Sequence, residues 1–301
     1  MNDILLFRYP GASEAQIPLA IFDFDGTIVK AKDGRPFPKN LEDWEFTRPS
    51  VPTVLKKTAE TRHIILVTDQ SKPWKVDQIH AVMKVLGLEP SIIIGVKKEH
   101  QKPATTLFDS QFPVFDKTQA FYVGDAAGRK GDWSDCDKVF AERLGVRFQV
   151  PEQVFPLEPL VFKPIPPIPE GEKEVVIMMG YPASGKSTLA KTLVDYHRVD
   201  GDALKTGSAM IKDASKHVGT ESIVFDCTAS NKKKRAFFVD FAKKHSRSVR
   251  IVYVSTPIER AMEQNKQRAL EGGADVPDIA FYMFRKHFEM PTEEEGTVIV
   301  V

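Results

Sequence analysis

Short apolar runs that end in polar residues alternate along the chain with segments of helical spacing. The runs are LAIFDFD (19–25), RHIILVTD (62–69), PSIIIGV (90–96), AFYVGDA (120–126), EVVIMMG (174–180), SIVFDCT (222–228) and VRIVYVS (249–255). Continuous apolar runs are typical of buried parallel strands, whose ligand sites lie at their carboxyl ends. Helical spacing is found at 74–87, which ends at Gly87, and at 186–196 and 232–244. The final residues, TVIVV, predict a terminal strand. The pattern predicts an α/β fold with doubly wound parallel sheets.

A proline-rich segment separates two such strand–helix series. Seven of the 21 prolines fall between Pro151 and Pro169. Proline fixes φ and removes a backbone donor, so this segment is neither helix nor central strand and reads as an extended spacer. Its interleaved apolar residues suggest that it lies along a protein surface. We therefore predict a first domain at 1–158, a linker at 159–170 and a second domain at 171–301.

Composition indicates the class of protein but does not identify its binding partner. The chain of 301 residues has 42% hydrophobic and 28% charged residues and a net charge of +1, which is typical of a globular protein and not of a strongly basic nucleic-acid binder. No apolar window approaches a membrane span, and residues 1–15 lack the features of a secretory signal. With only Cys136 and Cys227 present, two thiols in a reducing compartment are expected, and hence an intracellular protein.

Acidic residues follow the first predicted strand. Asp23 and Asp25 stand one residue apart before Gly26, and two buried acids repel each other unless a cation lies near them. Later strand ends and loops add Thr68, Lys102 and Asp125. Carboxylates, a hydroxyl and a lysine are suited to phosphoryl transfer through an aspartyl-phosphate with Mg²⁺.

These residues resemble the ordered motifs of haloacid dehalogenase-type phosphatases, D-x-D-G-T, then T/S, K and an acidic motif. The resemblance implies Asp23 as nucleophile, Asp25 as acid/base, Thr68 and Lys102 as phosphate ligands, and Asp125 with the two acids at the metal. Residues 28–67 and 69–101 leave no room for a large cap domain, which favours an open site that admits the end of a polymer.

The stretch GYPASGKST (180–188) lies between a predicted strand and a predicted helix, the context that a P-loop requires. Its backbone N–H groups would cradle phosphates, with Lys186 on the β/γ-phosphates and Ser187 on Mg²⁺. The nucleotide-binding residues predicted here are Gly180, Gly185, Lys186, Ser187, Thr188 and Asp226. Asp202 is a candidate base for an acceptor hydroxyl, Asp200 competes for that role, and Arg268 is a candidate lid residue that stabilises the transferring phosphoryl group.

From about residue 21 to 296 the chain resembles the bifunctional polynucleotide kinase/3′-phosphatases of DNA repair. The resemblance rests on FDFDGT, YVGDAAGR, VPEQVF, GYPASGKST and VPDIAFYMFRKHFEMPTEEEG. It implies removal of 3′-phosphates and ATP-dependent phosphorylation of 5′-hydroxyls at DNA strand breaks. It also implies Asp202 as the base and Arg235 as a further kinase-site contact. Three positions depart from the family pattern, Asp69, Gly201 and Ala229, and these departures bear on substrate preference.

Several alternatives stay open. One is a bifunctional small-metabolite kinase/phosphatase, and a second is a nucleotide-gated binding protein with degenerate sites. The cofactors expected are Mg²⁺ and ATP, and the partners are DNA strand ends, with RNA and a ligase as further candidates and no membrane. A monomer is expected, in the nucleus or else the cytoplasm. Trp74 and Trp133 are candidates for stacking on unpaired bases, with packing as an equal alternative.

Overall fold

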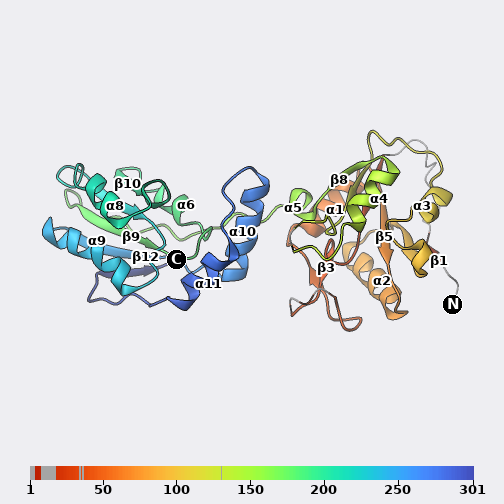
Figure 1. Ribbon diagram of the computed structural model, residues 1–301, viewed down its shortest axis with the longest axis horizontal. Helices are drawn as coiled ribbons and strands as arrows, with labels where there is room; N and C mark the ends of the chain where they lie inside the picture. Colours follow the sequence, from red (N-terminus) through yellow and green to blue (C-terminus); the bar gives the residue numbers. More distant parts are fainter. Residues whose placement is uncertain (1–3, 8–17, 34, 36, 130) are drawn as a thin grey trace. The chain divides into compact units, whose positions relative to one another are not determined.

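The computed structural model describes residues 4–7, 18–33, 35, 37–129 and 131–301. The chain divides into two compact units, Met1–Glu158 and Pro159–Val301, each with its own sheet (Figure 1). Both are α/β units built on parallel strands, so the predicted fold class is confirmed. Among the described residues, no helix has both the length and the apolar character needed to cross a membrane.

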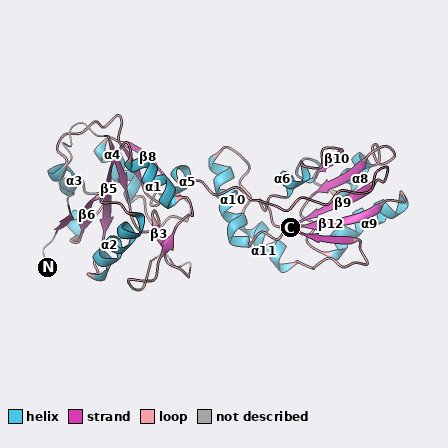
Figure 2. Cartoon of the chain, turned by 180° about the vertical axis from the view of Figure 1, so that it is seen from behind, coloured by secondary structure: helices cyan, strands magenta, loops and turns pink. Residues whose placement is uncertain are grey.

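The first unit carries a six-stranded sheet of order β1-β6-β5-β2-β7-β8 (Figure 2). All neighbours pair in parallel except β1, which runs antiparallel to β6 at one edge. The strands are β1 (Ile4–Phe7), β2 (Leu19–Phe22), β5 (His63–Asp69), β6 (Ser91–Gly95), β7 (Phe121–Val123) and β8 (Arg147–Gln149), with a small antiparallel pair, β3 (Val29–Lys30) and β4 (Glu45–Phe46). The helices are α1 (Val51–Ala59), α2 (Trp74–Leu86), α3 (Thr106–Gln111), α4 (Cys136–Leu144) and α5 (Pro151–Val154).

Alternate residues of the central strands bury their side chains on opposite faces of this sheet. Ala20 and Phe22 of β2 pack with helices α1 and α2, whereas Leu19 and Ile21 pack with α3 and α4. Both faces are covered, which explains why β2 and β5 read as continuous apolar runs instead of alternating ones. Between Asp25 and the start of β5 the described residues form β3, β4 and α1 and no separate cap domain.

The second unit carries a five-stranded, fully parallel sheet of order β10-β11-β9-β12-β13. The strands are β9 (Glu174–Met179), β10 (Tyr196–Asp200), β11 (Ser222–Asp226), β12 (Ser248–Tyr253) and β13 (Thr297–Val300), the last being the predicted terminal strand. The helices are α6 (Lys186–Ala190), α7 (Gly201–Leu204), α8 (Gly207–Ala214), α9 (Lys232–Lys244), α10 (Ile258–Leu270) and α11 (Asp278–Lys286).

The helix predicted over 186–196 is too long. Helix α6 ends at Ala190, and Tyr196 begins strand β10, where it pairs with Ser222. The Tyr196 hydroxyl also donates to Glu174 at 2.6 Å. Helical spacing alone could not reveal this strand, because the pairing partners that stabilise an edge strand lie far away in the sequence.

The proline-rich segment packs on one face of the second sheet. Phe162 and Ile165 lie against a cluster that includes Val176 and Leu189, and helices α8, α9 and α11 cover the other face. A Cβ on Gly185, which has φ +96°, would lie 2.4 Å from Cζ of Phe162. The expectation that this segment follows a protein surface is therefore confirmed at Phe162 and Ile165, and Phe162 contacts the loop 180–188 at Gly185. The expectation that the segment is not helical is wrong at its start, where Pro151–Val154 form α5, because proline is tolerated in the first turn of a helix.

Candidate active sites

The first candidate site lies at the carboxyl ends of three neighbouring strands. Asp23 follows β2, Thr68 lies near the end of β5, and Asp125 follows β7. Because β2 sits between β5 and β7 in the sheet, the three side chains meet at one edge. Gly26 has φ +76°, and a Cβ there would lie 2.5 Å from a carboxylate oxygen of Asp125, so this turn requires a glycine.

A buried lysine links the acids of this site. The Lys102 ammonium donates to Asp23 at 2.6 Å, to Asp137 at 2.6 Å and to the Tyr122 hydroxyl at 3.1 Å. Asp137 also accepts from the Tyr122 hydroxyl at 2.7 Å and from the backbone N–H of Ala126 at 3.0 Å. Asp137 is 1% exposed, so its carboxylate lies inside the protein beside Lys102.

Three carboxylates form a group suited to a divalent cation. Asp23, Asp125 and Asp137 each offer an oxygen, and these oxygens lie within 4.8 Å of one another. Three acids face one ammonium, so the group keeps an excess of negative charge in a buried place. Burial raises the pKa of Asp23 well above its ordinary value and that of Asp125 to about 6, with Asp137 adding to both shifts. A donor set of carboxylate oxygens with excess negative charge fits Mg²⁺.

The Asp25 side chain lies outside this three-carboxylate group. Its carboxylate accepts from the Lys75 ammonium at 2.5 Å and from the Gln70 amide at 2.8 Å, and that amide also donates to the Thr68 hydroxyl at 2.8 Å. Asp25 was predicted as a metal ligand, but the third carboxylate of the group is Asp137. Lys75 is 4% exposed and contacts the rings of Phe24 and Trp74. The structure therefore holds the Asp25 carboxylate between two donors, outside the three-carboxylate group, and a contact of Asp25 with the metal stays a prediction.

The second candidate site surrounds the loop between β9 and α6. A cleft of about 640 Å³ brings together Gly185, Lys186, Ser187, Thr188, Asp202, Asp226, Gln264 and Arg268. The Lys186 ammonium, which is 7% exposed, donates to the carbonyl of Tyr181 in the same loop. Burial lowers the pKa of Lys186 to about 8, against the effect of the nearby Asp226 carboxylate. Gly180, predicted as part of the loop, opens it with φ +151°.

Two neighbouring acids in this site have different tasks. Asp200 caps helix α7 by accepting from the backbone N–H groups of Asp202 and Ala203, at 3.0 and 3.1 Å, and it also pairs with Arg198 at 3.0 Å. Asp202 lines the cleft and is exposed. The geometry favours Asp202 over Asp200 as the acid that meets an acceptor hydroxyl.

The two predicted arginines lie in different environments. Arg268 lines the cleft, and its Nε is buried with no hydrogen-bond partner among the residues described. Arg235 does not line the cleft. It is fully buried, donates to both carboxylate oxygens of Glu295 at 2.8 and 2.9 Å, and donates to the carbonyl of Glu289 at 2.9 Å. A guanidinium with all three nitrogens engaged in this way is a structural anchor, and the predicted nucleotide contact of Arg235 is not supported.

Two of the three departures from the family pattern have local explanations. Asp69 accepts from the backbone N–H of Lys102 at 3.0 Å, and burial raises its pKa to about 6. A Cβ on Gly201 would lie 2.7 Å from the carbonyl oxygen of Asp226, so a larger side chain could not enter without a shift of the backbone. Ala229 adopts φ +35°, and nothing in the structure explains an alanine there.

Sequence reasoning did not identify Asp137, Lys75, Gln70 and Arg198. Arg198 donates to Asp226 at 2.6 and 2.8 Å, and so holds the acid that ends β11. Asp137 is the second residue of helix α4, twelve positions after Asp125, and does not follow a strand directly. Lys75 reads as a helix surface position in the sequence. The sequence signal that could have identified such residues is an acid or a lysine a few positions beyond a recognised motif.

Comparison with known proteins finds relatives for both units. Residues 18–155 match the family model of the polynucleotide kinase 3 phosphatase, and residues 209–291 match an AAA domain model. A bifunctional polynucleotide phosphatase/kinase of Schizosaccharomyces pombe is 32% identical over 91% of this chain and 76% of its own length. The polynucleotide 3′-phosphatase ZDP of Arabidopsis thaliana is 29% identical over 50% of this chain and 26% of its own length. Among solved structures, Chaetomium thermophilum Kti12 matches 42% of this chain and 88% of its own, with 19% identity and a TM-score of 0.36.

Proposed function

Since this chain belongs to the family of bifunctional polynucleotide phosphatase/kinases, we propose that its phosphatase centre is the three-carboxylate site and its kinase centre is the P-loop cleft. The protein is a polynucleotide 3′-phosphatase and a polynucleotide kinase that processes nucleic-acid strand ends. The observation that carries the assignment is the buried group of Asp23, Asp125 and Asp137 around Lys102 in the unit that matches the phosphatase model.

In the phosphatase step, a carboxylate oxygen of Asp23 attacks the phosphorus of a 3′-phosphate, and the bond from phosphorus to the 3′-oxygen breaks. Asp25 gives its proton to the departing 3′-oxygen. Water then attacks the aspartyl-phosphate while Asp25 takes a proton from it, which releases inorganic phosphate and restores Asp23. Gln70 bridges Asp25 and Thr68, and so sets the acid/base group against the hydroxyl that would bind the phosphate.

In the kinase step, a 5′-hydroxyl oxygen attacks the γ-phosphorus of ATP, and the bond to the β-phosphate oxygen breaks to leave ADP. Asp202 takes the proton of the hydroxyl. Lys186 at the P-loop and Arg268 on α10 face the cleft, where their charges would stabilise the transferring phosphoryl group.

Both centres have residues that fit Mg²⁺. Asp23, Asp125 and Asp137 would hold it in the first, and Ser187 with Asp226 in the second; when bound, it neutralises charge on the phosphate oxygens. Asp226 is 6% exposed and is kept in place by Arg198.

Among polynucleotides, we propose DNA as the substrate, with a 3′-phosphate or a 5′-hydroxyl at a strand break. The short insertions beside the phosphatase centre support a polymer over a small metabolite, because the residues described between Asp25 and β5 form β3, β4 and α1 alone. Trp133 is 66% exposed and lies beside the exposed Phe37, with ring centroids 6.3 Å apart, a pair that could stack on bases. A DNA ligase as the next enzyme and residence in the nucleus belong to the same proposal.

One experiment tests both assignments. The full chain is incubated with Mg²⁺, ATP and a nicked duplex that carries a 3′-phosphate and a 5′-hydroxyl, and both ends are followed. We expect Asp23→Asn to abolish only 3′ removal and Lys186→Ala to abolish only 5′ addition. A folded variant that loses both reactions would refute the division between two centres. Equal rates on RNA and on small phosphate esters would refute the choice of DNA.

A further inference from the structure

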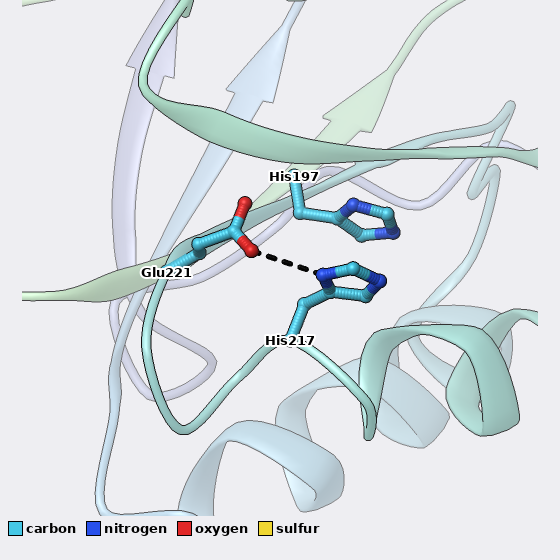
Figure 3. A group of neighbouring side chains, drawn as sticks. All are labelled: His197, His217 and Glu221. Atoms are coloured by element: carbon cyan, nitrogen blue, oxygen red, sulfur yellow. Dashed lines mark hydrogen bonds and ion pairs between the residues drawn. The ribbon is translucent and has the colours of Figure 1, made fainter.

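A second group of side chains that could bind a metal lies in the second unit, at the end of its sheet opposite the kinase cleft. His197 is the second residue of β10, His217 follows helix α8, and Glu221 directly precedes β11 (Figure 3). Each offers one ligand atom, and these atoms lie within 4.8 Å of one another. Asp200 ends β10 three positions after His197, so the group lies about 10 Å along the strand from the acids of the kinase cleft.

The two imidazole rings are stacked almost in parallel. Their centroids are 3.6 Å apart with an interplanar angle of 8°, and a carboxylate oxygen of Glu221 lies 2.9 Å from Nδ1 of His217 (Figure 3). A neutral imidazole ring carries a lone pair on one nitrogen, so each of the two rings can offer one ligand atom to a metal ion.

A fourth side chain orients one of the rings. Nε2 of His197 lies 2.9 Å from a carboxylate oxygen of Asp213, and the other Asp213 oxygen pairs with Lys216 at 3.2 Å. A carboxylate on one ring nitrogen keeps the proton there and leaves the second nitrogen free to bind a metal, the arrangement common to metal-ligating histidines. Asp213 would therefore support the site without binding the ion.

We propose that His197, His217 and Glu221 bind a divalent transition-metal ion of the Zn²⁺ type, with Asp213 as the hydrogen-bond partner of His197. Two imidazoles and one carboxylate suit Zn²⁺, Co²⁺ or Cu²⁺ and are a poor set for Mg²⁺, which prefers oxygen ligands. Zinc ligands of this kind stand about 2.0–2.2 Å from the ion, and an imidazole binds through a lone pair in its ring plane, so the two stacked rings would turn until a nitrogen of each points at the ion. The His217, His197 and Glu221 side chains are 34%, 22% and 43% exposed, which leaves the ion a path from solvent.

The ion would have a structural role. It would join strand β10 to the segment that leads into β11, and these two strands end in Asp200 and Asp226 beside the kinase cleft. Because β10 is an edge strand paired only with β11 in the described sheet, such a link would stabilise the side of the sheet with the fewest pairings.

The test is a titration of the full chain with Zn²⁺ in the presence of excess Mg²⁺ and ADP, which occupy the other two centres. We expect one equivalent of Zn²⁺ to bind and to raise the melting temperature. His197→Gln and His217→Gln should each abolish that binding, Asp213→Asn should weaken it about 10–100-fold, and His287→Gln, an exposed histidine of the same unit, should leave it unchanged.

Co²⁺ provides a second measurement, since its absorption spectrum reports imidazole ligands and a low coordination number. Glu221→Gln keeps the size and polarity of the side chain, so it tests the site even if a histidine variant fails to fold. Binding of Zn²⁺ by the histidine variants or by Glu221→Gln with the affinity of the unmodified chain would overturn the proposal. Loss of Zn²⁺ binding on Asp23→Asn alone would overturn it as well.

Discussion

The buried pair of Arg235 and Glu295 allows a sharp test of what Arg235 does. In Arg235→Met the aliphatic stem remains, but Glu295, 7% exposed, loses the guanidinium that donates to both its oxygens. Breaking a buried ion pair from one side costs about 3–5 kcal/mol, because a charge is left without a partner. For a unit of this size, that loss lowers the melting temperature by about 10–15 °C.

The chain has a built-in reference for this measurement. All three tryptophans, Trp44, Trp74 and Trp133, belong to the first unit. Tryptophan fluorescence therefore follows the first unit alone, while circular dichroism and calorimetry follow both. We expect Arg235→Met to lower the transition of the second unit and to leave the tryptophan transition where it was. Lys233→Met, an exposed position on the same helix, is the matched control.

The loss of stability in Arg235→Met should depend on pH in a direction that follows from the pKa of Glu295. Although burial opposes it, the hydrogen bond from Arg235 lowers the pKa of Glu295 in the folded protein below its ordinary value of 4.5. A lowered folded pKa stabilises the protein above the unfolded pKa, and this stabilisation is lost as pH falls through the folded value. The difference between Arg235→Met and the unmodified chain should therefore be full at pH 7 and shrink below about pH 4.5. Unchanged stability together with a large fall in kinase activity would refute this reasoning and return Arg235 to the nucleotide site.

Three further predictions concern the two centres. Lys75→Met should lower the 3′-phosphatase rate by about 10-fold or more and change the pH profile of that rate, because the variant removes the donor that lies 2.5 Å from the acid/base Asp25. The kinase rate should not change. An unchanged pH profile of the phosphatase would show that Lys75 has only a packing role. Since burial lowers the pKa of Lys186 to about 8, the affinity for ATP should fall above pH 8 as the ammonium loses its proton, whereas a flat affinity up to pH 10 would contradict this. Trp133→Ala should weaken binding of a 3′-phosphorylated oligonucleotide about 5–150-fold, equivalent to ~1–3 kcal/mol for one stacked base, without slowing hydrolysis of p-nitrophenyl phosphate. A parallel loss on both substrates would instead point to damage at the centre.

The sequence by itself was sufficient for the architecture and for the motifs at the strand ends. Continuous apolar runs indicated buried parallel strands, and the polar residues after them had to meet because carboxyl ends of parallel strands share one edge. Asp23, Thr68, Lys102 and Asp125 converge in this way in the first unit. Lys186 and Ser187 do so in the second, where strand, loop and helix are contiguous in the chain.

The tertiary structure alone decided which charged groups pair with one another. Asp137 joins the metal group from the start of a helix, Lys75 reaches Asp25 from another, and Arg235 meets Glu295 sixty positions further along the chain. Helices α7 and α8 lie between His197 and His217 in the sequence, so the spacing of the histidines does not indicate a metal site. Local periodicity records which face of an element is buried, whereas a pair between distant side chains depends on how those faces pack. For that reason the same residue types read as surface positions in the sequence and as paired, functional groups in the folded chain.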